Sequence, residues 1–498
     1  MGLKSLFSIP FARYHASRLK KARASAIHAQ STIFHNLLEG GKETLFGQEH
    51  SFSRLTSYQD FKNAVPIRDY EEGKKYIEMI IDGKEDVLWK GKPIYFCKTS
   101  GTTSGTKYIP ITKDSMPNHI LSARNALLSY ISETRKASFV DGKMIFLQGS
   151  PELGKIGGIA AGRLSGIVAN HIPAYLLKNR MPTHATNCIE DWEEKVDAIV
   201  EETIKEDMTL ISGIPSWVQM YFEKLLKKTG KETIKEIFPN FSLFVYGGVN
   251  FNPYRSIFDK TIGTSLPSIE LYPASEGFIA FQDSQKASGM LLIVDSGIFY
   301  EFIPVEDYYK ESPLRLSLED VEVGVNYALI INSNAGLWGY SIGDIIKFVS
   351  VDPYRIIVAG RLKHYISAFG EHVIAEEVES AMSIAVEKEG IEILEFHVAP
   401  QVNPPNGLPY HEWSVEFAND PADIGALALM IDRLMQEKNV YYRDLIEGKV
   451  LRKLVIRKIS KNGFVNFMRA RGKLGGQNKV PRLANDRQYA DELSKFAE

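Results

Sequence analysis

Residues 94–107 read Ile-Tyr-Phe-Cys-Lys-Thr-Ser-Gly-Thr-Thr-Ser-Gly-Thr-Lys, so that an apolar, strand-like run leads directly into hydroxylated residues and glycines. Glycines let the backbone approach an anion closely, and hydroxyl groups donate hydrogen bonds to its oxygens together with main-chain N–H groups. The stretch therefore predicts a phosphate-binding loop at the end of a buried strand.

This loop differs from a Walker A loop, which has the pattern G-x-x-x-x-G-K-[ST] and opens a helix. Here only three residues separate Gly101 from Gly105, and Thr106 stands between Gly105 and Lys107. A flexible surface turn is the alternative. Seven consecutive Ser, Thr or Gly residues, from 99 to 105, disfavour it.

Strand-like runs alternate with amphipathic helical patterns around the loop, which favours an α/β fold with buried sheets. Short apolar runs occur at 94–97, 144–147, 208–211 and 243–246. Residues 191–206 place apolar side chains on one helical face. From 297 to 350 the strands follow one another closely, which predicts an antiparallel, barrel-like section.

The pattern changes near residues 353–361. Beyond that point we expect a helix at 375–387, strands at 392–398 and 411–417 joined by a proline-rich loop, and a helix at 423–439. The sequence thus predicts a large α/β domain over 1–359 and a smaller α+β domain over 360–498.

Composition excludes several classes of protein. The 498 residues are 44% hydrophobic and 24% charged, and the net charge of −2 gives no general attraction for nucleic acid or an anionic membrane. Two cysteines, Cys97 and Cys188, exclude a disulfide framework, and no run approaches the roughly 18 apolar residues of a membrane helix. We expect a cytoplasmic protein with neither nucleic acid nor membrane as partner.

The first 38 residues are basic and contain no acidic residue. Such a segment resembles a mitochondrial presequence. The alternative, which we favour, is an amphipathic helix that packs on the main body through Leu19, Ala22, Ile27 and Ile33.

Two further segments carry carboxylates suited to a nucleotide. Residues 271–277 place Glu276 in a tight turn, where it suits Mg²⁺ beside a phosphate, because magnesium typically takes one or two carboxylates with the nucleotide. A turn-capping glutamate is the alternative. In 339–344, Asp344 follows a glycine and can accept hydrogen bonds from two ribose hydroxyls, unless it belongs to a simple hairpin turn.

Two basic residues complete the set. Arg361 stands where the second domain begins, and Lys479 lies in a glycine-rich, basic loop at 472–482. A loop of this kind can bring one cation to a charged transition state, where a positioned lysine is worth most. A solvated tail is the alternative.

The order of these motifs along the chain matches that of a known family. The loop, the Tyr-x-x-Ser-Glu turn at 272–276 and the Tyr-x-x-Gly-Asp segment at 340–344 resemble the three nucleotide motifs of the acyl acid amido synthetases. This family, the Gretchen Hagen or auxin-responsive promoter family, lies within the adenylate-forming superfamily of firefly luciferase and acyl-CoA ligases. The resemblance runs nearly end to end, and includes 61–66, 86–89, 108–111, 246–251 and 477–482.

The resemblance implies a two-step ligase whose small carboxyl-terminal domain rotates between the steps. A carboxylic acid attacks the α-phosphorus of ATP, which gives acyl-AMP and pyrophosphate. The amine of an amino acid then attacks the activated carbonyl, which gives an amide and AMP. ATP and Mg²⁺ are the implied cofactors, and the first step needs donors and Mg²⁺ because negative charge gathers at phosphorus.

The resemblance also implies a role for each motif residue. The phosphates would be cradled by Ser100, Gly101, Thr102, Thr103, Ser104 and Thr106. The adenine and α-phosphate would be lined by Tyr272, Ala274 and Ser275, with Gly247 and Gly248 opposite. Glu276 would hold Mg²⁺, Asp344 the ribose and Lys479 the adenylation transition state, while Arg361 matches an arginine that contacts ribose in acyl-CoA ligases.

Three departures limit the resemblance. Related CoA ligases commonly carry a lysine where Ser367 stands. This difference weakens the interpretation that the chain forms an acyl-CoA thioester, but does not remove it. Pro273 replaces a residue that is often small, and the chain is shorter than typical plant members, so plant substrate specificity is not transferred. The alternatives are an acyl-CoA ligase with the same adenylation step and a non-catalytic, adenylate-binding relative.

Overall fold

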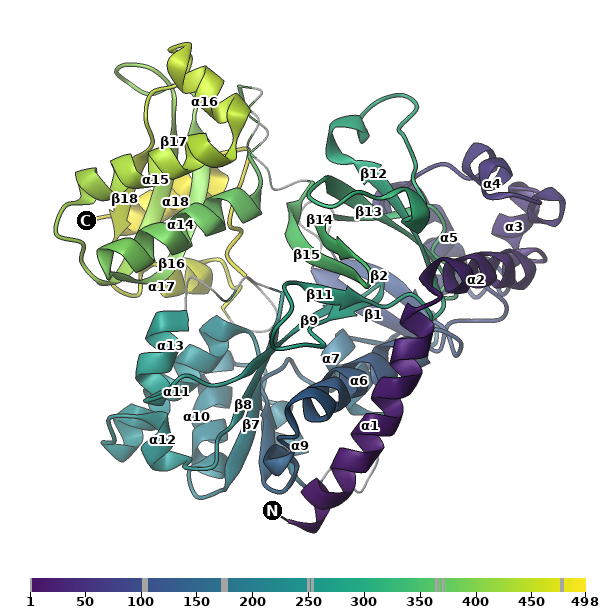
Figure 1. The fold of residues 1–498 in the computed structure, drawn as a ribbon, viewed down its shortest axis with the longest axis horizontal. Coiled ribbons are helices and arrows are strands. Elements are labelled where there is room, and N and C mark those ends of the chain that lie inside the picture. Colours follow the sequence, from purple (N-terminus) through teal and green to yellow (C-terminus); the bar gives the residue numbers. More distant parts are fainter. Residues whose placement is uncertain are drawn as a thin grey trace. The chain divides into compact units, whose positions relative to one another are not determined.

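A computed structural model describes residues 2–100, 106–171, 178–248, 251, 255–362, 366, 368–369, 371, 373–474 and 479–498. The chain divides into two compact units, one of residues 1–249 and 266–357 and one of residues 250–265 and 358–498. The boundary expected between 359 and 360 falls within strand β15 (Tyr354–Arg361), which runs from the first unit into the second. The fold has the mixed α/β architecture that the sequence predicts (Figure 1).

An 11-stranded sheet is the framework of the first unit. Its order is β12 (Ile298–Pro304), β13 (Asn326–Ser333), β14 (Tyr340–Val351), β15, β11 (Met290–Leu292), β10 (Gly277–Phe281), β9 (Ser268–Ala274), β8 (Leu243–Gly247), β7 (Met208–Ser212), β3 (Lys143–Phe146) and β6 (Arg180–Met181). Pairing is parallel from β6 to β9. These strands are short apolar runs, as expected of parallel strands covered on both faces.

The barrel-like section expected at 297–350 is a different structure. Strands β12, β13 and β14 pair antiparallel and continue the 11-stranded sheet, in which β12 is the last strand. The sheet therefore ends at β12 and does not close into a barrel. Closely spaced strands are common to both arrangements, and the sequence spacing did not distinguish them.

A second, four-stranded sheet carries the glycine- and threonine-rich loop. Its order is β2 (Thr106–Ile111), β1 (Tyr95–Ser100), β5 (Ile159–Gly162) and β4 (Gly154–Ile156). Strand β1 pairs with β2 antiparallel and with β5 in parallel. Phe96 and Cys97 are fully buried, which explains why the run before the loop is apolar.

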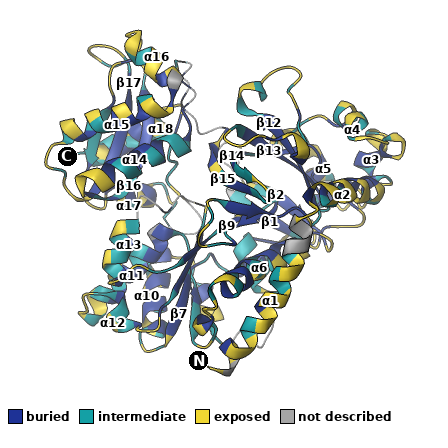
Figure 2. Cartoon of the chain, viewed as in Figure 1, coloured by how far each residue is buried: buried dark blue, intermediate teal, exposed yellow. Residues whose placement is uncertain are grey.

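Helices cover the first unit's sheets, and their buried faces and exposed faces are visible in Figure 2. The apolar face of α10 (Trp192–Thr203) is formed by Val196, Ile199 and Val200, as the helical spacing predicts. The remaining longer helices of this unit are α1 (Leu3–Arg23), α2 (Ala26–Gly41), α5 (Tyr70–Ile81), α6 (Met116–Thr134) and α11 (Pro215–Thr229).

The basic amino-terminal segment forms α1 and α2, as the favoured alternative predicts. The backbone N–H groups of Gly2 and Ser5 donate to the Asp141 carboxylate at 2.8 and 3.1 Å, which ties the start of α1 to a distant loop. Leu19 and Ile33 pack against the core. Ile27 is 38% exposed instead, and the side chain of Ala22 lies outside the described residues.

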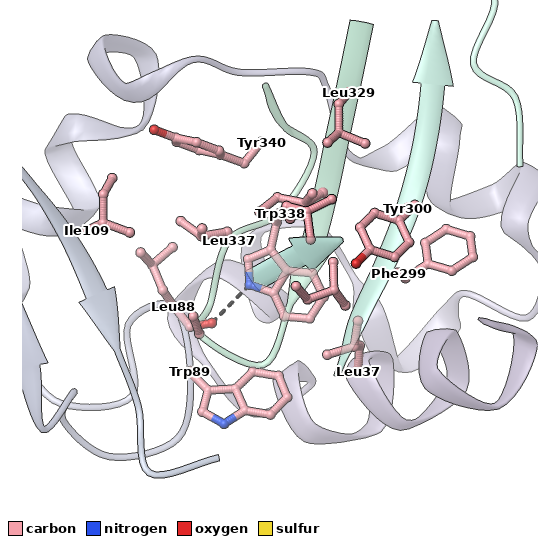
Figure 3. Close-up of a cluster of buried hydrophobic side chains, with 14 of the residues drawn as sticks. Leu37, Leu88, Trp89, Ile109, Phe299, Tyr300, Leu329, Leu337, Trp338 and Tyr340 are labelled. Atoms are coloured by element: carbon pink, nitrogen blue, oxygen red, sulfur yellow. Dashed lines mark hydrogen bonds between the residues drawn. The ribbon is translucent and has the colours of Figure 1, made fainter. Parts of the chain in front are cut away.

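A large hydrophobic cluster rich in aromatic residues joins α2 and α5 to the sheets, and Figure 3 shows part of it. The indole of Trp338 donates to the carbonyl of Leu88 at 2.9 Å and lies 4.8 Å from the ring of Phe52, measured between centroids. A Cβ on Gly41 would come within 2.7 Å of the Trp338 ring, so only glycine fits there. This packing fixes the chain immediately before Tyr340.

A buried ionic network supports the same segment. Arg315 donates to both carboxylate oxygens of Glu301 at 2.8 Å, and Asn332 donates to Glu301 at 2.8 Å. Asn332 in turn accepts from the backbone N–H of Gly339 at 2.6 Å. Glu301 is fully buried and Arg315 is nearly so, so each charge depends on the other.

The second unit is built on a three-stranded sheet in the order β16 (Glu392–Gln401), β17 (Tyr410–Asn419) and β18 (Val455–Ile459). Helices α14 (Ala375–Glu389) and α15 (Ile424–Lys438) begin within a residue of their predicted starts. The unit also contains α13 (Arg255–Ile262), α16 (Val440–Glu447), α17 (Gly463–Ala470) and α18 (Gln488–Leu493). In the described part of the chain, no helix is both long and apolar enough to cross a membrane.

The ionic network gives a first prediction. Arg315→Met leaves the Glu301 charge buried without its cation, so we expect the free energy of unfolding to fall by about 3–5 kcal/mol. Denaturant unfolding followed by intrinsic fluorescence measures this. The double substitution Arg315→Met/Glu301→Gln should recover part of the loss, and Lys42→Met, which breaks the exposed pair with Glu39, should change little. Equal stability of Arg315→Met and the parent would contradict the prediction.

A second prediction concerns the close approach of β8 to β9. A Cβ on Gly247 would lie 2.5 Å from the carbonyl oxygen of Leu271, a backbone atom that cannot move aside cheaply. Gly247→Ala should therefore lower the free energy of unfolding by about 1–3 kcal/mol. The matched control is Gly73→Ala in helix α5, where the added methyl group meets nothing within 4 Å. Because alanine favours helix, this control should gain roughly 0.5–1 kcal/mol.

Candidate active site

The glycine- and threonine-rich loop connects two paired antiparallel strands, β1 and β2. The register runs from Tyr95 opposite Ile111 to Ser100 opposite Thr106, so the two strands hold both ends of the loop. Thr106 is exposed where β2 begins. Gly101, Thr102, Thr103 and Ser104, together with the side chain of Ser100, lie outside the described residues. The loop is followed by strand β2, whereas a Walker A loop leads into a helix.

Ser275 and Glu276 form the turn between β9 and β10, whose last paired residues are Ala274 and Gly277. Cys97 of β1 lies next to this turn. The pKa of the Cys97 thiol is raised to about 12, mainly by burial, with a smaller contribution from the Glu276 charge, while a hydrogen bond with Ser275 lowers it. The strand that leads into the loop thus contacts the Ser-Glu turn directly.

Tyr272 and Asp344 meet although they come from strands far apart in the sheet. The Tyr272 hydroxyl donates to the Asp344 carboxylate at 2.5 Å. Strands β10, β11 and β15 separate β9 from β14 in the sheet order, so the contact requires strong curvature. Both side chains are buried, with 8% and 7% of their surface exposed. The predicted adenine-lining tyrosine and the predicted ribose-binding carboxylate are therefore neighbours.

Glu276 is the second carboxylate of this group. The hydroxyl of Tyr340, at the start of β14, lies 3.4 Å from a carboxylate oxygen of Glu276, a long hydrogen bond. Burial raises the pKa of Tyr340 well above its ordinary value, and the negative charge of Glu276 raises it further. Tyr340 consequently stays protonated and donates to the carboxylate. Sequence reasoning included Tyr340 in a motif but gave it no role.

The glycines predicted opposite the adenine end strand β8. Gly247 pairs with Leu271 in the parallel register, one residue before Tyr272. Gly248 follows with a φ of +80°, which favours glycine, and is exposed. The backbone is therefore exposed at Gly248, whereas Gly247 is partly covered by the adjacent strand β9. This is the arrangement that a flat ring needs for close approach.

A backbone bridge from Arg68 holds the Tyr340 segment on its other side. The Arg68 N–H donates to the carbonyl of Gly339 at 2.9 Å, and the Ser341 N–H donates to the carbonyl of Arg68 at 2.8 Å. Sequence reasoning missed Arg68, because an isolated bridge between residues so far apart leaves no periodic pattern.

The two basic candidates belong to the second unit. Arg361 is exposed at the end of β15. Lys479 is exposed, and the residues that follow it are anchored: Arg482 donates to the carbonyl of Phe396 at 2.6 Å, and the His397 ring lies 2.7 Å from the carbonyl of Pro481. The structure thus holds the base of the Lys479 segment against β16. Ser367 lies outside the described residues.

Glu276 is the carboxylate that the sequence predicts for magnesium. Among the described residues, no group of three or more His, Cys, Asp or Glu side chains gathers to hold a metal ion. Glu276 is a half-buried carboxylate in a turn beside the loop strand. One carboxylate of this kind fits Mg²⁺ that takes its other ligands from a nucleotide and water.

Comparison with known proteins agrees with the motif order. Models of the GH3 family match at residues 15–182 and 162–267 (N-terminal domain), 291–361 (central domain) and 376–488 (C-terminal domain). The N-terminal matches alone cover more than half of the chain.

Curated relatives are plant enzymes. Jasmonoyl–L-amino acid synthetase JAR4 of Nicotiana attenuata is 23% identical, over 78% of this chain and 80% of its own. Indole-3-acetic acid-amido synthetase GH3.3 of Arabidopsis thaliana is 22% identical, over 92% of this chain and 89% of its own.

Two solved structures share the fold. The AtGH3.15 acyl acid amido synthetase in complex with 2,4-DB has a TM-score of 0.80 at 15% identity, covering 98% of this chain and 96% of its own. A 2-hydroxyisobutyryl-CoA ligase in the postadenylation state has a TM-score of 0.59 at 12% identity, covering 94% and 91%. The resemblance first seen in three motifs extends over the whole fold, and this chain belongs to the GH3 family.

Proposed function

We propose that the chain is an ATP-dependent acyl acid amido synthetase, which adenylates a carboxylic acid and transfers the acyl group to the amine of an amino acid. The observation that carries the proposal is the meeting of Tyr272, Glu276 and Asp344, which brings two of the three nucleotide motifs into contact beside the strand that leads to the third. Family membership and the named activities of the relatives support it.

The nucleotide would bind at the edge formed by the ends of β8, β9 and the β1–β2 hairpin. In this proposal Asp344 accepts hydrogen bonds from the ribose, and Tyr272 fixes the orientation of that carboxylate by its 2.5 Å hydrogen bond. The adenine would lie on Gly247, Gly248 and Ala274, with Ser275 near the α-phosphate. The phosphates would be held by Ser100, Gly101, Thr102, Thr103, Ser104 and Thr106.

The first step places negative charge on the oxygens around the α-phosphorus. Donors that already point toward that position stabilise the charge without reorganisation. Glu276 would hold Mg²⁺, which supplies positive charge to the phosphate oxygens. The Tyr340 hydroxyl, kept protonated by burial, would orient the Glu276 carboxylate for this role.

The second unit would contribute Lys479 to the adenylation transition state and Arg361 to the ribose. We further propose that residues 360–498 act as a mobile domain between the half-reactions. The basis for this mobility is the family resemblance, because hinge rotation is a common way to reorganise a site between two steps. Arg482 anchors the residues that follow Lys479 to the carbonyl of Phe396.

The proposed substrates are a small carboxylic acid and an amino acid, and the proposed location is the cytoplasm. Relatives named for jasmonoyl and indole-3-acetic acid conjugation support the substrate class. Identity of 22–23% does not transfer the particular acid. Both cysteines are free thiols, which fits a reducing compartment.

The nucleotide site gives a third prediction. Glu276→Ala and Asp344→Ala should abolish acid-dependent exchange of pyrophosphate into ATP, because one removes the metal ligand and the other the ribose acceptor. Tyr272→Phe keeps the ring but loses the hydrogen bond, so we expect a smaller loss, mainly in the KM for ATP. Ordinary exchange rates in both alanine variants, measured on protein whose thermal unfolding matches the parent, would show that the roles are wrong.

Lys479 gives a fourth prediction. Lys479→Ala should slow adenylation on the order of 100-fold while ATP affinity changes little, because the cation acts on charge that develops only in the transition state. Single-turnover formation of acyl-AMP and equilibrium binding of ATP separate the two effects. Lys473→Ala, in the same basic segment, is the control. Equal losses in rate and in affinity would contradict a transition-state role.

The acceptor in the second step is tested separately. After adenylation with a panel of carboxylic acids, amino acids or CoA are added, and product is identified by mass. We expect amide and AMP. Turnover with CoA and none with any amino acid would identify an acyl-CoA ligase, and absence of exchange with every acid would identify an adenylate-binding relative.

A further inference from the structure

Helix α1 carries an exposed apolar stripe. Leu6, Phe7, Phe11 and Tyr14 have 57%, 69%, 49% and 59% of their surface exposed. Large apolar side chains with this exposure are scattered singly over the rest of the described chain, whereas here four fall within nine residues. Single exposed apolar residues are ordinary, but a continuous patch marks an interaction site.

The stripe lies on one side of the helix. Phe7, Phe11 and Tyr14 are spaced four and three residues apart, so their side chains follow one another along the same face. Ser5 and Ala12 of the same helix are fully buried, and α1 packs against α6. The helix thus packs on the protein through Ala12, Ile9 and Leu19, while three aromatic rings of the stripe remain exposed to solvent.

Positive charge accompanies the stripe. Lys4, Arg13 and Arg18 are exposed on the same helix, and the sequence has no acidic residue before Glu39. The net charge of −2 averages this segment with an acidic remainder. The near-neutral charge of the whole chain therefore does not describe α1, which is positively charged and can be attracted to an anionic membrane.

Further cations lie beside α1. A cavity of about 580 Å³ is lined by His15 and Arg18 of α1 and by Arg124 of α6. Burial lowers the pKa of His15, and the charges of Arg124 and Arg18 lower it further. Asp114 and Asp295 also line the cavity, and Asp114 is paired with Lys90 at 3.2 Å.

We propose that α1 docks the protein reversibly on a bilayer that contains anionic phospholipids, with Phe7, Phe11 and Tyr14 inserted at the interface. An interfacial helix combines exposed aromatic and aliphatic residues with lysine and arginine, and lies in the plane of the membrane. The start of α1 is tied to Asp141, so the stripe is presented on a folded body.

Charge decides between a bilayer and a second copy of the chain. A dimer through two α1 stripes would bring two cationic helices together, and like charges at such a contact are unfavourable. An anionic surface instead attracts the same cations. The proposal is independent of the ligase function, because none of these residues belongs to the nucleotide site.

The test is partition of the full chain between buffer and vesicles in a sedimentation assay. One set of vesicles contains phosphatidylcholine and phosphatidylglycerol, and the other contains phosphatidylcholine alone. We expect binding to the anionic vesicles that weakens as salt is raised. Phe7→Ser/Phe11→Ser/Tyr14→Ser should weaken this binding on the order of tenfold or more, because it removes the inserted surface.

A second variant separates charge from insertion. Lys4→Gln/Arg13→Gln/Arg18→Gln should weaken binding to the anionic vesicles and flatten its salt dependence. The matched control, Tyr309→Ser/Leu314→Ser/Val323→Ser, removes three exposed apolar side chains elsewhere in the first unit and should bind as the parent does. Circular dichroism and thermal unfolding establish that each variant is folded.

Insertion is also measured without removing the stripe. In Phe7→Trp, the emission maximum of the new tryptophan should shift to shorter wavelength when anionic vesicles are added. It should stay unchanged when neutral vesicles are added. Failure of the parent to bind anionic vesicles would overturn the proposal. Binding of the Phe7→Ser/Phe11→Ser/Tyr14→Ser variant equal to that of the parent would also overturn it. So would the finding that this variant changes only the monomer–dimer equilibrium and not vesicle binding.

Discussion

The hydrogen bond between Tyr272 and Asp344 is the constraint on which the candidate site depends. It joins β9 to β14 across three intervening strands, and therefore exists only because the 11-stranded sheet is strongly curved. A flat sheet would place the two side chains far apart. The curvature also brings Tyr340 to Glu276, so that two carboxylates are each approached by a buried tyrosine.

The parts of the first unit that hold this curvature are themselves buried and polar. Arg315 and Asn332 both donate hydrogen bonds to Glu301. Asn332 also accepts a hydrogen bond from the backbone N–H of Gly339, which directly precedes Tyr340. Arg68 holds the same segment from its other edge through main-chain hydrogen bonds. A buried charge pair is weak support for stability in general, but it admits few alternative arrangements of the groups around it. Here it fixes the strand that carries Asp344.

Much of this could be predicted from the sequence, for reasons visible in particular residues. The mixed α/β fold follows from apolar runs such as 208–211, and the two helices expected at 375–387 and 423–439 follow from their apolar spacing. The GH3 family follows from three motifs in a fixed order. The prediction of a barrel-like section at 297–350 was wrong, because the spacing of strands in the sequence does not show whether a sheet closes. The roles of Arg68 and Tyr340 were missed, because both depend on contacts between residues far apart in the chain. The roles assigned to the motif residues stay predictions.

The Cys97 thiol can report when strand β1 separates from the Ser275 turn. The thiol is fully buried under the Ser275 turn and its pKa is raised, so at neutral pH it is protonated and closed to reagents. Cys188, the other cysteine, is partly exposed. A thiol reagent should therefore modify Cys188 in the folded protein and reach Cys97 only when β1 separates from the turn. The rate of that second modification then measures how often the strand that carries the glycine- and threonine-rich loop leaves its place.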